Sequence, residues 1–485
     1  MANRKQTLQA ALLPLLNGLI IGIAFTFLVA PVDKKLWAIP IVLASVALYA
    51  NGFFGGNRFF VANSRGGYVS LTGRLFLFFI AVFLIRQYLQ DYKIFTAVGF
   101  GTLYALDYAI KDLCLCLILM SVFWGEKSLP QVAGFISIIT GIGFWAVSNL
   151  IVDALGLHLF KVEQQAEFGE SRLDFIGTRW FPPLVVSNWS CSAACSIILV
   201  ATLFIWWRAW QIRPSAFKKI YLLPLLISLL AGAVLIVRCQ FRTQVIVLPL
   251  LLFWVVLVNH RRLKKLLYVL VLVWFVTAPF LLAGNRSELI LSSLRVDDLL
   301  KSVGTRVDSR VFKLSGRSDL YANGLEKLED VSTVLWGEGP SLRDASITSR
   351  GTYNYDAIDK DTEASRGQLY HAGFFDLLFS CGGVMTLIFL GILGLCLNFL
   401  WRFAGRKGLP DQVGFDMDLT LFYFLAWMVL SCTDPGIFGY FEMLVLALIP
   451  LFGAMRYITL PQRAPVVRPR AAPAYSSERT EPATN

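Results

Sequence analysis

The chain has 485 residues, of which 56% are hydrophobic and only 16% are charged. Soluble domains carry about 25% charged residues. This composition, with apolar runs long enough to cross a bilayer, excludes soluble, disordered, fibrous and nucleic-acid-binding proteins. The formal net charge of +12 then raises the question of which side of a membrane the basic residues face.

Apolar stretches with few charges predict about twelve membrane-spanning helices, and so an all-α polytopic membrane protein. They lie near residues 9–30, 37–54, 68–85, 104–124, 131–153, 185–207, 220–237, 243–258, 266–284, 382–401, 415–432 and 437–455. The fourth is the weakest because Asp107 and Lys111 interrupt it, and 94–106 is an alternative re-entrant or interfacial segment.

The basic residues favour one orientation of these spans. With the N-terminus inside, the inner segments hold 21 Lys and Arg residues and the short outer loops hold 6. The positive-inside rule therefore predicts that both termini are cytoplasmic. The first span resembles a retained anchor rather than a cleaved signal. The tail 458–485 is rich in Pro, Ala, Ser and Arg, so we expect it to be disordered.

Two outer segments, 154–184 and 285–372, are longer than a connection requires. The second holds 12 Lys and Arg residues, 14 Asp and Glu residues and no run that could span a bilayer. We therefore divide the chain into an N-terminal transmembrane bundle (1–284), an outer loop domain (285–372), C-terminal transmembrane helices (373–457) and the tail.

Within the loop domain, the pattern predicts two helices and a turn. Apolar residues from Leu289 to Val303 recur at helical spacing, which is typical of a helix on the membrane surface or of one that caps the bundle. Gly316-Arg317-Ser318-Asp319-Leu320-Tyr321 opens a second helical pattern. Leu335-Trp336-Gly337-Glu338-Gly339-Pro340 predicts a tight turn.

Three residues at the outer ends of spans could carry chemistry. His371 is one of three histidines and lies where the loop domain meets a span. Imidazole can take a proton from a hydroxyl group near neutral pH, although it could equally be an ordinary interfacial histidine. Arg238 and Arg242 follow the seventh span, where arginine either binds phosphate or extends to lipid headgroups.

Other candidates are less specific. Arg74, within or near the third span, either binds phosphate or extends to lipid headgroups, as for the outer arginines. Asp434 lies in an outer turn, where aspartate could serve only to form the turn. The sequence shows no zinc spacing, P-loop or dinucleotide fingerprint. We therefore expect no metal, no cofactor and no ATP chemistry.

These segments together resemble the bacterial O-antigen ligase (WaaL-type) and Wzy-type O-antigen polymerase superfamily. His371, Phe374, Phe375, Leu378 and Gly382 keep the spacing of the family's closing His-Asn-x-Tyr-Leu…Gly element, although Ala372 replaces the usual Asn. Two further matches lie in the loop domain: Gly316–Tyr321 is similar to a Gly-x-Arg element of the family, and 336–339 to its glycine turn. Arg242 is similar to the family's arginine at the end of a span. Arg172 with 175–177 is similar to its Arg…Gly…Asn segment.

The resemblance implies a GT-C-type glycosyltransferase with a large helical periplasmic loop in the bacterial inner membrane. It implies metal-independent, inverting transfer of a glycan from undecaprenyl diphosphate to a lipid A-core hydroxyl. Arg242 and Arg317, with Arg238, would hold the diphosphate, His371 would be the general base, and Arg74, Arg172 and Asp434 would support them.

Two alternatives stay open. The basic approach to Arg74 and the position of Asp434 favour a ligase over a Wzy-type polymerase, which shares the same chemistry. A transporter of lipid-linked sugars belongs to another class and predicts internal repeats or helices broken near the membrane midplane. No convincing repeat is found in the sequence, and most candidate residues cluster at one surface.

Overall fold

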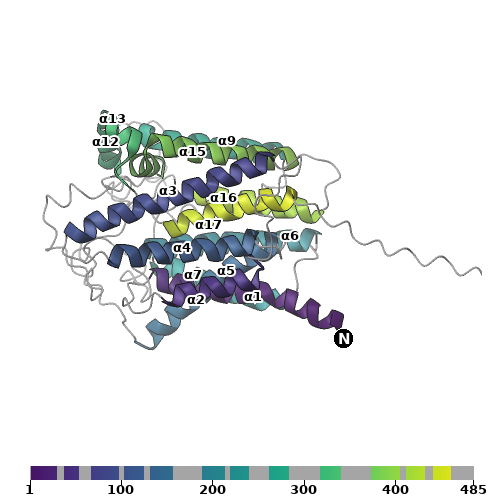
Figure 1. The fold of residues 1–485 in the computed structure, drawn as a ribbon. Helices are drawn as coiled ribbons and strands as arrows, with labels where there is room; N and C mark the ends of the chain where they lie inside the picture. Colours follow the sequence, from purple (N-terminus) through teal and green to yellow (C-terminus); the bar gives the residue numbers. More distant parts are fainter. Residues whose placement is uncertain are drawn as a thin grey trace, which may run out of the picture.

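The computed structural model describes residues 2–29, 38–53, 67–97, 103–124, 131–156, 188–212, 219–239, 261–282, 317–339, 373–404, 411–431 and 441–459. Within these ranges the regular structure is helical and no strand occurs. The long helices lie roughly parallel in one bundle, and the short helices α12 and α13 lie at one end of it (Figure 1). This end is called the α12–α13 end below.

Eleven of the twelve predicted spans form helices. They are α1 (Ala2–Val29), α2 (Ala38–Ala50), α3 (Gly67–Ala97), α4 (Leu103–Trp124), α5 (Gln131–Ala154), α6 (Asn188–Ile212), α7 (Leu222–Cys239) after the 3-10 turn η4 (Lys219–Tyr221), α9 (Arg261–Leu282), α15 (Gly373–Ala404), α16 (Asp411–Ser431) and α17 (Phe441–Thr459). The predicted span 243–258 and the predicted surface helix 289–303 lie outside the described residues. Two short helices, α12 (Arg317–Lys327) and α13 (Val331–Trp336), come from the predicted loop domain.

Length and composition make this a helical membrane protein. Five of the described helices are long and apolar enough to cross a bilayer: Ser70–Gln90, Val132–Ala154, Lys219–Cys239, Gly373–Phe399 and Val413–Ser431. Five more described helices have shorter apolar cores. A hydrocarbon layer of about 30 Å needs about 20 helical residues, which the five longer segments supply.

The charged fourth span forms one continuous helix, α4. Lys111 and Asp107 lie one turn apart and form an ion pair of 2.6 Å. The neighbouring Asp112 accepts a hydrogen bond of 2.8 Å from the side chain of Gln87 on α3. Polar side chains that are satisfied inside the protein are tolerated in a membrane helix. Of the segment 94–106, predicted as an alternative re-entrant or interfacial piece, the structure describes 94–97 as the end of α3 and 103–106 as the start of α4.

Two groups of apolar side chains hold the helices together. In the larger one, Phe76, Trp124 and Phe452 bring α3, α4 and α17 together, with ring centroids between 4.9 and 5.7 Å apart. The smaller one has Tyr321, Phe375, Leu378 and Phe379 at its centre. It attaches α12 to the first turns of α15, and so fixes the loop helices on the bundle.

Candidate functional site

The helix α12 begins at Arg317, close to where the sequence predicts a helix to open. Tyr321, one turn later, is only 1% exposed and packs in the same apolar cluster as Phe375 of α15. Phe280 of α9 packs against Phe375 with ring centroids 5.2 Å apart. Burial of these aromatic rings therefore fixes the start of α12 beside the start of α15.

His371 lies just before α15 in the chain. It falls outside the described residues, but α15 begins only two residues later, at Gly373. Two residues of chain reach at most about 7 Å. In the sequence, His371 therefore comes directly before the end of α15 on which α12 packs.

The helix α15 is interrupted at Gly382, which has the non-helical dihedral angles φ 82° and ψ 161°. Such a backbone is essentially restricted to glycine. Before the interruption, the carbonyl of Phe379 accepts a hydrogen bond of 2.7 Å from the N–H of Glu338, and that of Ser380 accepts one of 3.0 Å from the N–H of Gly339. The segment after α13 therefore pairs with the broken helix. We call residues 337–339 and 379–382 together the α13–α15 junction.

Two glycines allow this close approach. Gly337 has a positive φ of 70°, and a Cβ added to it would lie 2.5 Å from the backbone nitrogen of Gly382. A Cβ added to Gly382 would lie 2.4 Å from the carbonyl carbon of Trp336. Both contacts involve backbone atoms, which cannot turn aside, so no larger residue fits at either position without moving the chain.

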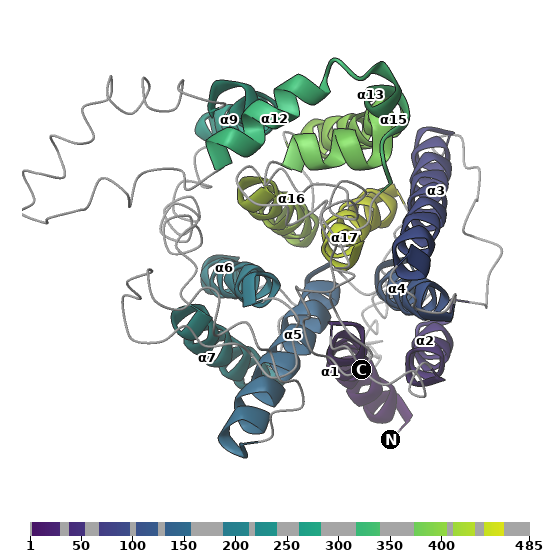
Figure 2. The same ribbon diagram turned by 90° about the vertical axis from the view of Figure 1, so that its left-hand side faces the viewer.

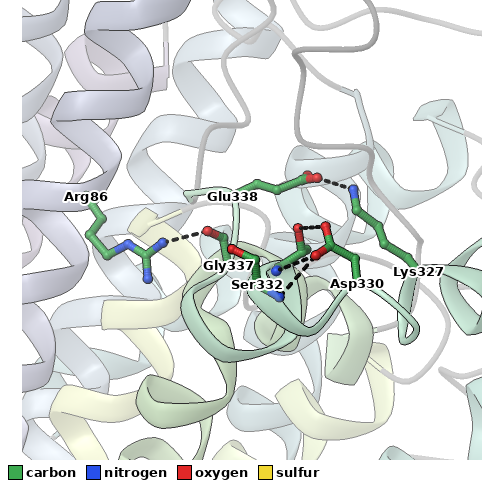
Figure 3. A network of polar contacts seen from close by, with 7 residues as sticks. Arg86, Lys327, Asp330, Ser332, Gly337 and Glu338 are labelled. Carbon is green, nitrogen blue, oxygen red and sulfur yellow. Dashed lines mark hydrogen bonds and ion pairs between the residues drawn. The ribbon is translucent and has the colours of Figure 1, made fainter.

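Arg86 of α3 connects both sides of the junction, and Figure 3 shows its contact with Gly337. Its Nη1 donates a hydrogen bond of 2.6 Å to the carbonyl of Cys381, and its Nη2 donates one of 3.0 Å to the carbonyl of Gly337. A charged donor makes a stronger hydrogen bond than a neutral one. The guanidinium thereby joins α3, α13 and α15 at a single point.

The loop helices carry their own polar contacts next to the junction. The carboxylate of Asp330 caps α13 by accepting hydrogen bonds from the N–H groups of Ser332 and Thr333, at 3.0 and 3.3 Å, and from the hydroxyl of Thr333 at 2.6 Å. The Thr333 hydroxyl bond, followed by the backbone bonds, holds the pKa of Asp330 below its usual value. Lys327 of α12 forms an ion pair with Glu338 (Figure 3). These contacts link α12, α13 and the junction in one unit.

Three buried polar side chains lie on the helices that form the junction, and sequence reasoning missed them. Gln87 and Gln90 of α3 are 7% and 8% exposed, and Asp376, in the first turn of α15, is 1% exposed. A Cβ on Gly339 would lie 3.0 Å from the Cβ of Gln90, so the junction lies directly against α3. One signal for Asp376 is present in the sequence, namely a lone carboxylate five residues after His371 at the start of an apolar helix.

The remaining predicted residues are not brought to this place by the described structure. Arg238, in the last turn of α7, forms an ion pair of 2.8 Å with Asp153 of α5. The helices α5 and α7 lie across the bundle from α12 and α13 (Figure 2). Arg74 is exposed on α3, 12 residues before Arg86 and hence about 18 Å away along the helix. Arg172, Arg242 and Asp434 lie outside the described residues.

Comparison with known proteins adds no family to this description. No model of a known protein family matches the chain, and no curated protein sequence matches it. The fold and the site therefore define a class: a helical membrane protein in which α3, α12, α13 and α15 assemble a polar junction at one end of the bundle.

Proposed function

We propose that this protein is a glycosyltransferase that uses a lipid-diphosphate-linked glycan, and specifically an O-antigen ligase of the bacterial inner membrane. It transfers a glycan from undecaprenyl diphosphate to a sugar hydroxyl of lipid A-core. The proposal includes a GT-C-type bundle of about twelve spans, both termini in the cytoplasm, and the loop domain 285–372 on the periplasmic face. The α12–α13 end is then the periplasmic end.

One observation carries this proposal. Three short elements resemble the ligase and polymerase superfamily, 316–321, 336–339 and 371–382, and they are separated in the chain by up to about 50 residues. Their described residues meet in space: Tyr321 packs with Phe375, and Gly337 lies against Gly382. A chance resemblance gives no reason for three separate elements to assemble, whereas a shared active site does.

The proposed chemistry is the one that the resemblance implies. The acceptor hydroxyl oxygen attacks the anomeric carbon of the glycan while the bond from that carbon to the diphosphate oxygen breaks. His371 takes the hydroxyl proton, and attack from the face opposite the leaving group inverts the anomeric configuration. Undecaprenyl diphosphate leaves with the bonding electrons.

Arginine side chains would stabilise the leaving diphosphate. We assign this role to Arg317 because it begins α12, and Tyr321 of the same helix packs with Phe375 near the start of α15. Arg242 is a second candidate for the diphosphate. Arg238 already pairs with Asp153 on the other side of the bundle, so we assign the diphosphate to Arg317 and Arg242 alone.

The test is transfer by the purified full-length protein in detergent, with a lipid-diphosphate-linked glycan and lipid A-core, without nucleotide and with or without a chelator. A single shift of lipid A-core on a gel supports the ligase. A ladder from the donor alone would instead identify a Wzy-type polymerase. Movement of the donor across vesicles without any new product would identify a transporter and refute the enzyme.

Matched variants assign the roles. His371→Ala and Arg317→Ala should abolish transfer while membrane insertion and thermal stability are retained. Gly391→Ala is the control, because a Cβ on this glycine of α15 meets no described atom within 4 Å. Full activity in either active-site variant would remove the role assigned to that residue.

A further inference from the structure

The helix α13 presents large apolar side chains on its surface. Val331, Leu335 and Trp336 are 66%, 45% and 64% exposed. Val331 and Leu335, four positions apart, lie on the same side of the helix, and Trp336 follows Leu335 by about 100° around the axis. The three therefore cover one broad, exposed apolar side of α13, which we call its apolar face. An apolar face of this kind is costly to expose to water. Contiguous exposed apolar patches therefore usually mark a contact surface.

The position of α13 indicates what this face contacts. The helix lies at the rim of the bundle, beside α15 (Figure 2). A Cβ on Gly383 would lie 3.0 Å from the carbonyl oxygen of Val334, so α13 lies against the interruption in α15. Just beyond that contact, Val384 and Leu387 of the apolar segment Gly373–Phe399 are 47% and 70% exposed. The exposed residues of α13 therefore lie close to exposed apolar residues of α15.

The lengths of two helices place α13 at the membrane boundary. Ala404, at the end of α15, follows Gly382 by 22 residues, which is about 33 Å of helix. Arg86 follows Gly67, at the start of α3, by 19 residues, about 29 Å. A hydrocarbon layer is about 30 Å thick. With Gly67 and Ala404 at one boundary of this layer, Arg86 and Gly382 therefore lie at the other.

We propose that the face formed by Val331, Leu335 and Trp336 inserts into the bilayer, at the boundary between the lipid headgroups and the acyl chains. Tryptophan is enriched at this level because its ring is apolar and its N–H is polar. The neighbouring Lys327–Glu338 ion pair and Asp330 supply the polar groups that such an interfacial helix turns to water. The bilayer thus sets the height of α12 and of the junction. This inference does not depend on the proposed enzyme activity.

Quenching of tryptophan fluorescence by lipids tests the inference. The full-length protein is placed in nanodiscs whose phospholipids carry bromine on the upper acyl carbons, and emission is compared with unbrominated nanodiscs. Trp336→Phe should lower the part of the emission that bromine quenches. Trp145→Phe is the matched control, because Trp145 is 0% exposed and its removal should lower only the unquenched part. Unchanged quenchable emission in Trp336→Phe would overturn the inference.

A photoreactive residue at position 331 identifies the contact directly. Val331 is the most exposed of the three residues, so a larger side chain there does not disturb the core. Irradiation in nanodiscs should attach phospholipid to this position and not to a photoreactive residue at position 145. Attachment to a second copy of the chain, or to another segment of the same chain, in place of phospholipid would refute the bilayer as the partner.

Discussion

The contact between α1 and α5 and the α13–α15 junction both depend on glycine, for different reasons. A Cβ on Gly22 would lie 2.6 Å from the carbonyl oxygen of Gly141, and one on Gly141 would lie 2.8 Å from that of Gly18. These glycines are inside regular helices. At the junction, Gly337 and Gly382 instead have positive φ angles, and nearby carbonyls bond outside their own helix.

This difference distinguishes glycines that let two helices pack closely from glycines that hold an irregular segment in position. Helices in a bilayer associate through small residues that let the backbones approach, and this needs no polar partner. Irregular backbone leaves N–H and C=O groups outside the helical ladder, and these need other partners where they are buried. The junction meets this condition with Arg86 and the segment 337–339, so its stability depends on a few specific hydrogen bonds, whereas that of the α1–α5 contact depends on shape.

The largest effect is expected from Gly382→Ala. Holding alanine in this glycine conformation costs about 1–3 kcal/mol. The new Cβ also meets the backbone of Trp336 at 2.4 Å. We expect a large drop in the midpoint of thermal unfolding in detergent, or no folded protein. Gly391→Ala, on the same helix, should stay close to the wild type. Equal midpoints for the two variants would mean that the interruption in α15 is not required.

The next largest effect is expected from Arg86→Ala, which leaves the carbonyls of Gly337 and Cys381 without the guanidinium. Hydrogen bonds to charged groups contribute about 1.5–3 kcal/mol each, so we expect the loss of both to destabilise the protein by about 3–6 kcal/mol. Arg86→Lys should be intermediate, because one ammonium cannot reproduce the planar fork. Thermal unfolding, with protease cleavage within 337–339 as a local measure, checks both.

A second arginine provides the comparison for this result. The side chain of Arg238 is 44% exposed and pairs with Asp153, and exposed ion pairs contribute about 0–1 kcal/mol. Arg238→Ala should therefore change stability much less than Arg86→Ala. Similar losses of stability in the two variants would show that the hydrogen bonds of Arg86 stabilise the protein no more than an exposed ion pair does.

Gly22→Ala tests the packing side of the comparison. The added Cβ meets Gly141 and Phe144 at 2.6 and 2.8 Å, and overpacking of this kind costs about 1–3 kcal/mol. The unfolding midpoint should fall, but protease cleavage within 337–339 and transfer per folded molecule should stay unchanged. Cleavage at the junction in this variant would show that the two regions are coupled.

The same contrast explains which features could be predicted from sequence. Hydropathy depends only on local composition, so the helices were predicted well, and so was the opening of α12 near Arg317. Where a tight turn is predicted, residues 337–339 form a bend, and Leu335 and Trp336 are the last residues of α13. The tenth predicted span begins at residue 382, but α15 begins at Gly373. The residues from Gly373 onward belong to the same apolar segment, and Gly382 interrupts the helix without starting it.

The site itself depends on tertiary contacts and was harder to predict. Arg86 is an ordinary basic residue at the end of a span until α13 and α15 provide the two carbonyls. The ion pair of Arg238 with Asp153 joins residues 85 positions apart, and no local pattern indicates it. Gly382 was predicted as part of a spacing motif, but its dihedral angles follow from its contact with Trp336.

The smallest predicted effect concerns the cap of α13 and depends on pH. The pKa of Asp330 is lowered in the folded protein from the usual 3.8, so its capping contribution is complete above that value and is lost as the pH falls through the lower folded pKa. Hydrogen exchange of the Ser332 and Thr333 amides, corrected for intrinsic rates, should therefore increase below about pH 4. Asp330→Asn keeps a capping side chain without a titrating group, so its corrected exchange should not change with pH. The same pH dependence in both proteins would show that another group, and not the Asp330 carboxylate, controls the opening of α13.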